Sequence, residues 1–165
     1  MTGMVTPALR EREQQSIVVT TSSPPGWQMA HVHAPGLVLR MDPDALIREG
    51  ATCSCAEHEA VHAQHYFVCI EANARDGLWL PLFSAPRVGT KELPNAARIG
   101  DPRWVGTSSH YHPEQIWRAP HKAVQRAAAA AHDSSSGKLA NRIKTEFLPP
   151  IAELMPFKEQ DRRGD

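Results

Sequence analysis

Residues 65–84 read HYFVCIEANARDGLWLPLFS, and they carry the strongest strand signal in the chain. Residues 65–71 are rich in β-branched and aromatic side chains, and residues 78–84 form a second apolar run. The Asp76-Gly77 pair between two such runs is typical of a β-hairpin turn. Pro81 lacks a backbone N–H, so it predicts a bulge or an edge position in the second strand.

Short strands and turns are expected before this hairpin. A Pro35-Gly36 turn leads into an apolar run over residues 37–41, which predicts a first strand. Residues 44–64 then differ in character, since alanine, glutamate and histidine dominate them. We interpret them as an excursion between strands, in which residues 56–64 have the composition for two helical turns.

Helices are expected mainly after the hairpin. Residues 120–132 give the strongest helix signal, because a proline stands at the start and an alanine run follows. Residues 104–105 predict a short strand, and residues 138–147 predict a second, shorter helix. The summed pattern predicts an α+β protein: a small β-barrel with a helical excursion after the first strand and one or two C-terminal helices.

Composition indicates one domain with polar ends. The 165 residues divide into a flexible N-terminal arm over residues 1–26, a single barrel-plus-helix domain over residues 27–155 and a frayed tail over residues 156–165. No run of eighteen apolar residues occurs, which excludes a transmembrane helix, and no signal peptide is visible. The three cysteines favour free thiols in a reducing compartment, so we expect a cytoplasmic protein without contact to membranes.

The zero net charge conceals an uneven distribution. Residues 1–85 contain five basic and nine acidic side chains, whereas residues 86–145 contain ten basic and four acidic side chains, a local charge of +6. This basic block begins just after Ser84. It predicts either a local surface for phosphate groups or an ordinary solvated face.

One stretch combines thiols and imidazoles at metal-ligand spacing. Cys53 and Cys55 lie just before the string His58-Glu59-Ala60-Val61-His62, which matches the HExxH pattern of zinc peptidases. The chain supplies no clear third ligand downstream for such a peptidase. A zinc site formed by Cys53, Cys55, His58 and His62 is therefore one hypothesis, and a polar, histidine-rich excursion without metal is the other. Glycine-rich phosphate loops and the GxSxG elbow are absent from the sequence.

Three stretches, read in order, resemble the PemK/MazF-like family of ribonuclease toxins. The opening strand of that family resembles HAPGLVLRMDP at residues 33–43, and its central hairpin is similar to QHYFVCIEANARDGLWLPLFS at residues 64–84. The segment leading into the family's late helix resembles EQIWRAPHKAV at residues 114–124. The resemblance implies an SH3-like barrel, a single-stranded RNA substrate, a homodimer and an antitoxin protein as partner.

The resemblance also indicates where a site would lie and where this chain departs from the pattern. The family's catalytic Arg-Pro pair falls at His65-Tyr66, whereas its hydroxyl residue after the second strand is retained as Ser84. Cleavage of RNA without a metal or cofactor needs a base, an acid and a group that stabilises the phosphorane. We therefore predict catalytic roles for His65 as base and acid and for Ser84 and Arg87 as stabilising groups, with His62 as a further candidate acid.

Two other hypotheses remain at this point. A non-catalytic barrel of the same fold could bind a protein or a nucleic acid, because the Arg-Pro pair is replaced. The second is the zinc-binding protein described above. For binding single-stranded RNA, Trp79, Trp104, Trp117 and Tyr111 are candidate platforms for base stacking, although tryptophans in a chain of this size are commonly core residues.

Overall fold

The computed structural model describes residues 33–56, 59–106, 108–133 and 140–154. The predicted arm over residues 1–26 and the predicted tail over residues 156–165 lie outside the described residues. Within the described ranges the protein is α+β and consists mostly of antiparallel sheet with a few helices. None of the helices in these ranges is long and apolar enough to cross a lipid bilayer.

The predicted hairpin is confirmed and forms the middle of the main sheet. Strands β4 (His65–Ala72) and β5 (Asp76–Leu82) pair antiparallel. Asn73 closes the turn, because its Oδ1 accepts hydrogen bonds from the backbone N–H groups of Arg75 and Asp76. The bulge lies in β4 between Cys69 and Glu71 rather than at Pro81. Pro81 instead lies beyond the part of β5 that pairs with β9, so its missing N–H costs no hydrogen bond on that side.

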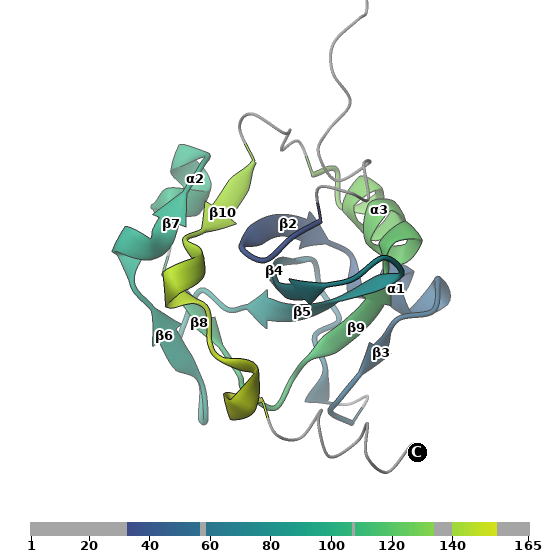
Figure 1. The fold of residues 1–165 in the computed structure, drawn as a ribbon, viewed down its shortest axis with the longest axis horizontal. Coiled ribbons are helices and arrows are strands. Elements are labelled where there is room, and N and C mark those ends of the chain that lie inside the picture. Colours follow the sequence, from purple (N-terminus) through teal and green to yellow (C-terminus); the bar gives the residue numbers. More distant parts are fainter. Residues whose placement is uncertain (1–32, 57–58, 107, 134–139, 155–165) are drawn as a thin grey trace, which may run out of the picture.

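Seven strands form one curled sheet around this hairpin (Figure 1). Their order is β3-β9-β5-β4-β2-β10-β7. The remaining bounds are β2 (Leu37–Met41), β3 (Thr52–Cys53), β7 (Arg98–Ile99), β9 (Trp117–Pro120) and β10 (Asn141–Ile143). The edge strands β3 and β7 do not pair with each other in the described part of the chain, so the expected barrel is not closed.

A separate two-stranded sheet lies against the end of the hairpin. It consists of β6 (Lys91–Leu93) and β8 (Ser109–Tyr111). Phe83, just after β5, forms an antiparallel bridge with His110 of β8, and both backbone N···O distances are 2.8 Å. This bridge fixes the position of the chain that leaves β5, which is where Ser84 and Arg87 lie.

The excursion after the first strand is helical, but not where the sequence predicted. Helix α1 (Pro43–Arg48) follows β2 directly, because Asp42 caps it by accepting from the Asp44 N–H and Pro43 occupies its first turn. Gly50, with φ of +105°, then turns the chain into β3. The described residues between 59 and 64 contain no α-helix, so the prediction of two helical turns over residues 56–64 is wrong there.

The C-terminal elements confirm one helix and correct two other predictions. Helix α3 (His121–Ala130) matches the predicted helix. The predicted strand at residues 104–105 is helix α2 (Pro102–Val105), which begins because the Asp101 side chain accepts from the Arg103 N–H. The predicted helix over residues 138–147 is wrong in its described part, since β10 pairs with β2 and β7 and a 3₁₀ turn follows at Thr145–Phe147. Pairing on both sides outweighs the local helix preference.

The sheet separates two clusters of buried apolar side chains. One cluster packs with α1 and α3 and includes Leu39, Phe67, Trp79 and Trp117. The other packs with α2 and includes Val68, Leu80, Trp104 and Ile143. Figure 1 shows α1 and α3 at one side of the molecule and α2 with β6, β7 and β8 at the other. Because β2 and β4 are covered on both faces, polar side chains become accessible mainly where these strands end.

Candidate functional site

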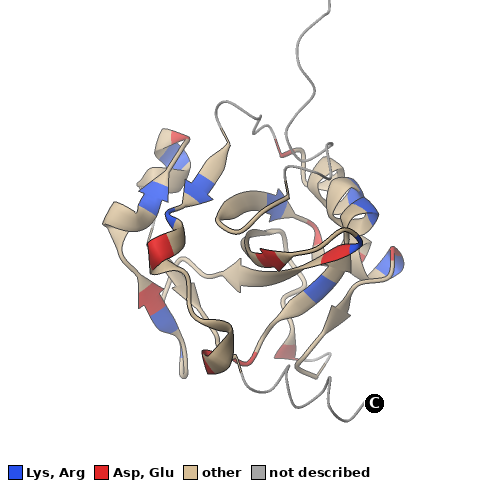
Figure 2. Ribbon diagram, viewed as in Figure 1, with Lys and Arg blue, Asp and Glu red and all other residues tan. Residues whose placement is uncertain are grey.

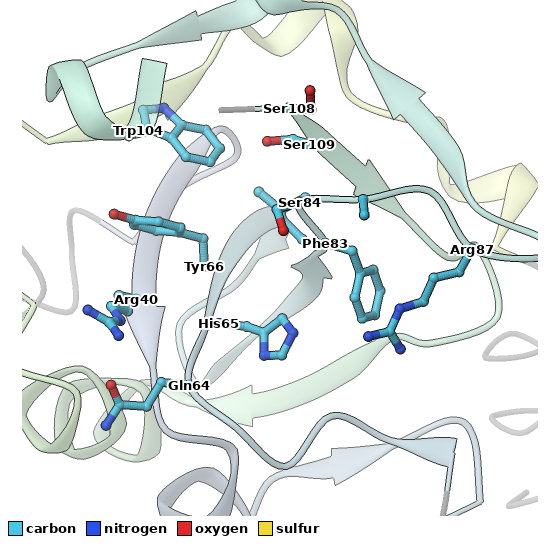
Figure 3. Close-up of a pocket in the computed structure, with 12 residues that line it drawn as sticks. Arg40, Gln64, His65, Tyr66, Phe83, Ser84, Arg87, Trp104, Ser108 and Ser109 are labelled. Carbon is cyan, nitrogen blue, oxygen red and sulfur yellow. The ribbon is translucent and has the colours of Figure 1, made fainter. Parts of the chain in front are cut away.

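A cavity of about 310 Å³ lies where β2, β4 and β5 meet α2 and the start of β8 (Figure 3). Strand register places its walls side by side, because Arg40 pairs with Tyr66 and Tyr66 pairs with Leu82. We call this the first cavity. Its lining consists of Arg40, Gln64, His65, Tyr66, Leu82, Phe83, Ser84, Ala85, Arg87, Trp104, Ser108 and Ser109.

Hydrogen bonding fixes the tautomer of His65 in this cavity. The Nδ1 atom lies 2.7 Å from the carbonyl oxygen of Ala63. Since a carbonyl oxygen can only accept, the proton of the neutral ring resides on Nδ1. The Nε2 atom of His65 therefore carries a lone pair, which is the arrangement that a general base requires.

Phe83 connects His65 with Arg87. The His65 and Phe83 rings meet edge to face with centroids 5.4 Å apart, and the Arg87 guanidinium carbon lies 4.6 Å from the centroid of the same Phe83 ring. Figure 3 shows the Phe83 ring between the two side chains. The backbone of Arg87 is held by Thr90, whose Oγ1 accepts from the Arg87 N–H and donates to the Arg87 carbonyl.

The predicted catalytic residues are divided between two cavities. His65, Ser84 and Arg87 all line the first cavity, although 22 positions separate His65 from Arg87 in the sequence. His62 does not line it; this side chain lines a second cavity on the other side of the segment that precedes β4. The structure therefore brings three of the four residues together and separates His62 from them.

Arg40 and Tyr66 are parts of this site that sequence reasoning missed. Burial raises the pKa of the Tyr66 phenol, and the nearby positive charge of Arg40 acts in the opposite direction. Tyr66 is therefore a neutral hydroxyl donor at neutral pH. The signal for Arg40 was its position as the sole charged residue of the apolar strand LVLRM. Its alignment with residue 66 depends on strand register, which the sequence did not provide.

The lining of the first cavity is positively charged, while the carboxylates of Asp101 and Asp133 act on Tyr66 from outside that lining. Arg40 and Arg87 line the cavity, and its lining contains neither Asp nor Glu in the part of the chain that the structure describes. Arg87 belongs to the basic block predicted at residues 86–145, whereas Arg40 comes from the acidic first half. Other basic residues of the block lie on α2, β7 and β10, which gather at one side of the molecule in Figure 2.

Trp79, Trp104, Trp117 and Tyr111 are core residues rather than base-stacking platforms. Trp79, Trp104 and Trp117 are at most 1% exposed, and Tyr111 is 5% exposed. Trp104 borders the first cavity, but its ring packs against Tyr66 with centroids 5.1 Å apart, and the Arg98 guanidinium lies over it at 5.6 Å. Of the two alternatives for these rings, the structure therefore supports the core one, and none of them is an exposed platform for base stacking. The half-buried Tyr66 and His65 are the accessible rings at this site.

The second cavity, of about 560 Å³, lies beside α1 and β3. It is lined by Pro43, Asp44, Ile47, Arg48, Cys53, Cys55, Ala60, Val61, His62 and Trp117. The sulfur atoms of Cys53 and Cys55 are 3.4 Å apart. Burial raises the pKa of the Cys53 thiol and, together with the hydrogen bond and charge of Cys53, raises the pKa of Cys55 to about 12.

The predicted zinc ligands are brought together only in part. Cys53, Cys55 and His62 border the second cavity, while His58 lies outside the described residues. Across the described ranges, no group of three or more histidine, cysteine, aspartate or glutamate side chains is arranged to hold a metal ion. A four-ligand zinc site has no support from the described geometry.

Comparison of the chain with protein-family models, with curated proteins and with solved structures found no match.

Proposed function

We propose that this protein is a metal-independent endoribonuclease that cleaves single-stranded RNA in the first cavity. One observation carries the proposal: His65, Ser84 and Arg87 line one cationic cavity, and His65 and Arg87 contact the same Phe83 ring. Carboxylates, the usual protein ligands of Mg²⁺, are absent from the described lining of this cavity. The proposed chemistry therefore relies on the side chains alone.

The proposed reaction begins at the Nε2 atom of His65. This atom accepts the proton of a ribose 2′-hydroxyl, and the 2′-oxygen then forms a bond to the adjacent phosphorus. The guanidinium of Arg87 and the hydroxyl of Ser84 stabilise the negative charge that develops on the phosphoryl oxygens. The bond from phosphorus to the 5′-oxygen breaks, and that oxygen receives the proton that His65 accepted. The products are a 2′,3′-cyclic phosphate and a 5′-hydroxyl.

Two further features of the cavity support RNA as the ligand. Arg40 and Arg87 supply positive charge for consecutive phosphates of a flexible strand. The hydroxyl groups of Tyr66, Ser84, Ser108 and Ser109 supply neutral hydrogen-bonding groups in the same lining. The proposal also includes membership of the PemK/MazF-like family, an SH3-like fold, a homodimer and an antitoxin protein as partner. These parts are supported by the ordered sequence resemblance over residues 33–43, 64–84 and 114–124.

A non-catalytic RNA-binding or protein-binding role is the second candidate. It is favoured by the presence of His65-Tyr66 where the resembled family has its catalytic Arg-Pro pair. In this case the same cationic cavity would hold a strand without cleaving it. The catalytic and the RNA-binding candidates differ in one measurable property, the integrity of the bound RNA, whereas a protein-binding role predicts neither binding nor cleavage of RNA.

The deciding experiment incubates the purified full-length chain with a long unstructured RNA in EDTA. We expect discrete fragments with cyclic phosphate ends, and we expect His65→Ala to reduce the cleavage rate by about 100-fold or more, because a positioned proton-transfer group contributes that much. His62→Ala is the matched control, since this exposed histidine lines the other cavity. RNA that is bound but intact would support the non-catalytic RNA-binding role. RNA that is neither bound nor cleaved would contradict both RNA roles and favour the protein-binding alternative.

A further inference from the structure

The second cavity contains a pair of thiols that the proposed RNA chemistry does not use. Cys53 and Cys55 are both half-buried, both line this cavity, and neither forms a disulfide in the structure. Their sulfur atoms lie 3.4 Å apart. The third cysteine, Cys69, is fully buried in the core between β2 and β5, so it provides an internal reference of the same residue type.

A bend at Ser54 brings the two sulfur atoms together. Residues two apart in an extended strand point to the same face, but their side chains are well separated along the strand. Here β3 ends at Cys53, and Ser54 and Cys55 form a bend. The bend folds Cys55 back, so that the two thiols hydrogen-bond to each other.

Hydrogen bonds on both sides of Ser54 hold this bend in place. The Ser54 N–H donates to the Ile116 carbonyl over 2.9 Å, and the Ile116 N–H donates to the Ser54 hydroxyl over 2.9 Å. The same hydroxyl donates to the Glu114 carbonyl over 2.7 Å. The residue between the two cysteines is therefore anchored to the segment that leads into β9, and the proximity of the thiols is built into the fold.

We propose that Cys53 and Cys55 form a redox site that closes to an intramolecular disulfide by exchange with a low-molecular-weight disulfide such as glutathione disulfide. A sulfur–sulfur bond is about 2.05 Å long, so the sulfur atoms must approach by about 1.4 Å, which rotation of the two side chains can supply. The ring spans a single intervening residue and is therefore strained. Strained disulfides are readily reduced, which makes this pair a reversible site rather than a structural staple.

The exchange conserves atoms and electrons. One cysteine thiolate attacks a sulfur of glutathione disulfide, forms a mixed disulfide and releases one glutathione thiolate. The second cysteine thiolate then attacks the protein-bound sulfur of that mixed disulfide, which closes the ring and releases the second glutathione. The protein loses two protons and two electrons, and the glutathione disulfide gains them as two thiols.

The experiment uses the reduced full-length chain in mixtures of glutathione and glutathione disulfide. After acid quenching and unfolding, remaining thiols are labelled with N-ethylmaleimide and the intact mass is measured. We expect oxidised protein to carry one maleimide, at Cys69, instead of three, with no attached glutathione, and we expect dithiothreitol to restore three labels. Three labels in every mixture, a glutathione adduct that persists on the wild-type chain, or a disulfide-linked dimer would each overturn the proposal.

Cysteine variants assign the ring to this pair. Cys53→Ser and Cys55→Ser should each stop at a glutathione adduct, because the second thiol is absent. Cys69→Ala is the matched control and should close the ring as the wild type does. If Cys69→Ala fails to fold, mapping the maleimide on the wild-type chain decides the same question, since a label on Cys53 or Cys55 in the oxidised form contradicts the assignment.

Discussion

Both cavities lie where a strand ends, but the side chains that line them differ in charge and reactivity. Each lies where a strand ends and the chain bends, at Phe83 and Ser84 after β5 in the first and at Ser54 after β3 in the second. The first contains two arginines and no carboxylate in its described lining, whereas the second contains both Arg48 and Asp44 together with two thiols. A short segment joins them, because Val61 and His62 line the second and Gln64 and His65 line the first.

Backbone position, rather than residue type, decides which cavity each of the two neighbouring histidines lines. His62 and His65 are three positions apart, and both are typical acid–base residues at neutral pH. The start of β4 at His65 places one ring against Phe83 at the first cavity. His62 comes before the strand and turns to the thiol cavity instead. A test of either cavity can therefore use the other as its control.

The largest expected effect is a steep pH dependence of the rate of ring closure at the second cavity. Because burial raises the pKa of Cys53 and raises that of Cys55 to about 12, both thiols stay protonated at neutral pH. The reactive thiolate fraction then grows tenfold for each pH unit, so the rate of ring closure should rise by about 100-fold between pH 7 and pH 9. Timed maleimide labelling in a fixed excess of glutathione disulfide measures this rate.

A rise of only about 25-fold that levels off above pH 8.5 would contradict this prediction, since an ordinary exposed cysteine with a pKa of about 8.5 gives that profile. Cys53→Ser provides the control for the chemical step. In this variant the rate of glutathione addition reports Cys55 alone, without the hydrogen bond and charge of Cys53 that help to raise its pKa.

The next effect concerns the cationic character of the first cavity. Arg40→Ala and Arg87→Ala should each weaken binding of a single-stranded oligonucleotide by about tenfold at low salt, because each guanidinium pairs with a phosphate. In the double variant, the slope of log K against log salt should become shallower by about 1.4, which corresponds to two lost contacts with a single strand. Fluorescence anisotropy over a salt series measures both quantities.

Two arginines outside the first cavity provide matched controls. Arg48 lines the second cavity, and Arg75 lies in the turn at the far end of the β4–β5 hairpin. Arg48→Ala and Arg75→Ala should leave both the affinity and the salt slope unchanged. Equal losses for all four variants would mean that RNA responds to overall charge and not to this cavity.

The sequence predicted the elements whose signals are local. The hairpin over residues 65–84 and the late helix follow from side chains within each segment, and both are present. The strand β10 failed as a prediction because its three residues gain their conformation by pairing with β2 and β7, which are distant in the chain. Trp104 and Val105 are strand-forming residues and predict a strand, but the Asp101 cap and Pro102 just before them begin helix α2 instead.

The residues of the candidate site likewise divide into those that local sequence predicts and those that pairing with distant segments places there. The family resemblance predicts His65 and Ser84 at the start and just after the end of the hairpin, and Arg87 follows Ser84 by three positions. The pairing of β4 with β5 brings all three to one cavity. Arg40 entered the site only through its register with Tyr66 across β2 and β4. The 3.4 Å approach of Cys53 and Cys55 likewise depends on hydrogen bonds from Ser54 to residues 114–116, about sixty positions away.

The smallest expected effect concerns the hydrogen bonds of the Ser54 side chain that hold the bend between the two cysteines. Ser54→Ala removes the hydroxyl that accepts from the Ile116 N–H and donates to the Glu114 carbonyl. One of these bonds is exposed and the other only partly buried, so water can replace the lost partner and the cost should be about 1 kcal/mol in the free energy of unfolding. Urea denaturation measures this cost. Because the bend also positions the thiols, ring closure should be slower in Ser54→Ala than in the wild type. RNA cleavage should stay at the wild-type rate. Unchanged ring closure would mean that the backbone hydrogen bond from Ser54 to Ile116 is enough to hold the thiols together.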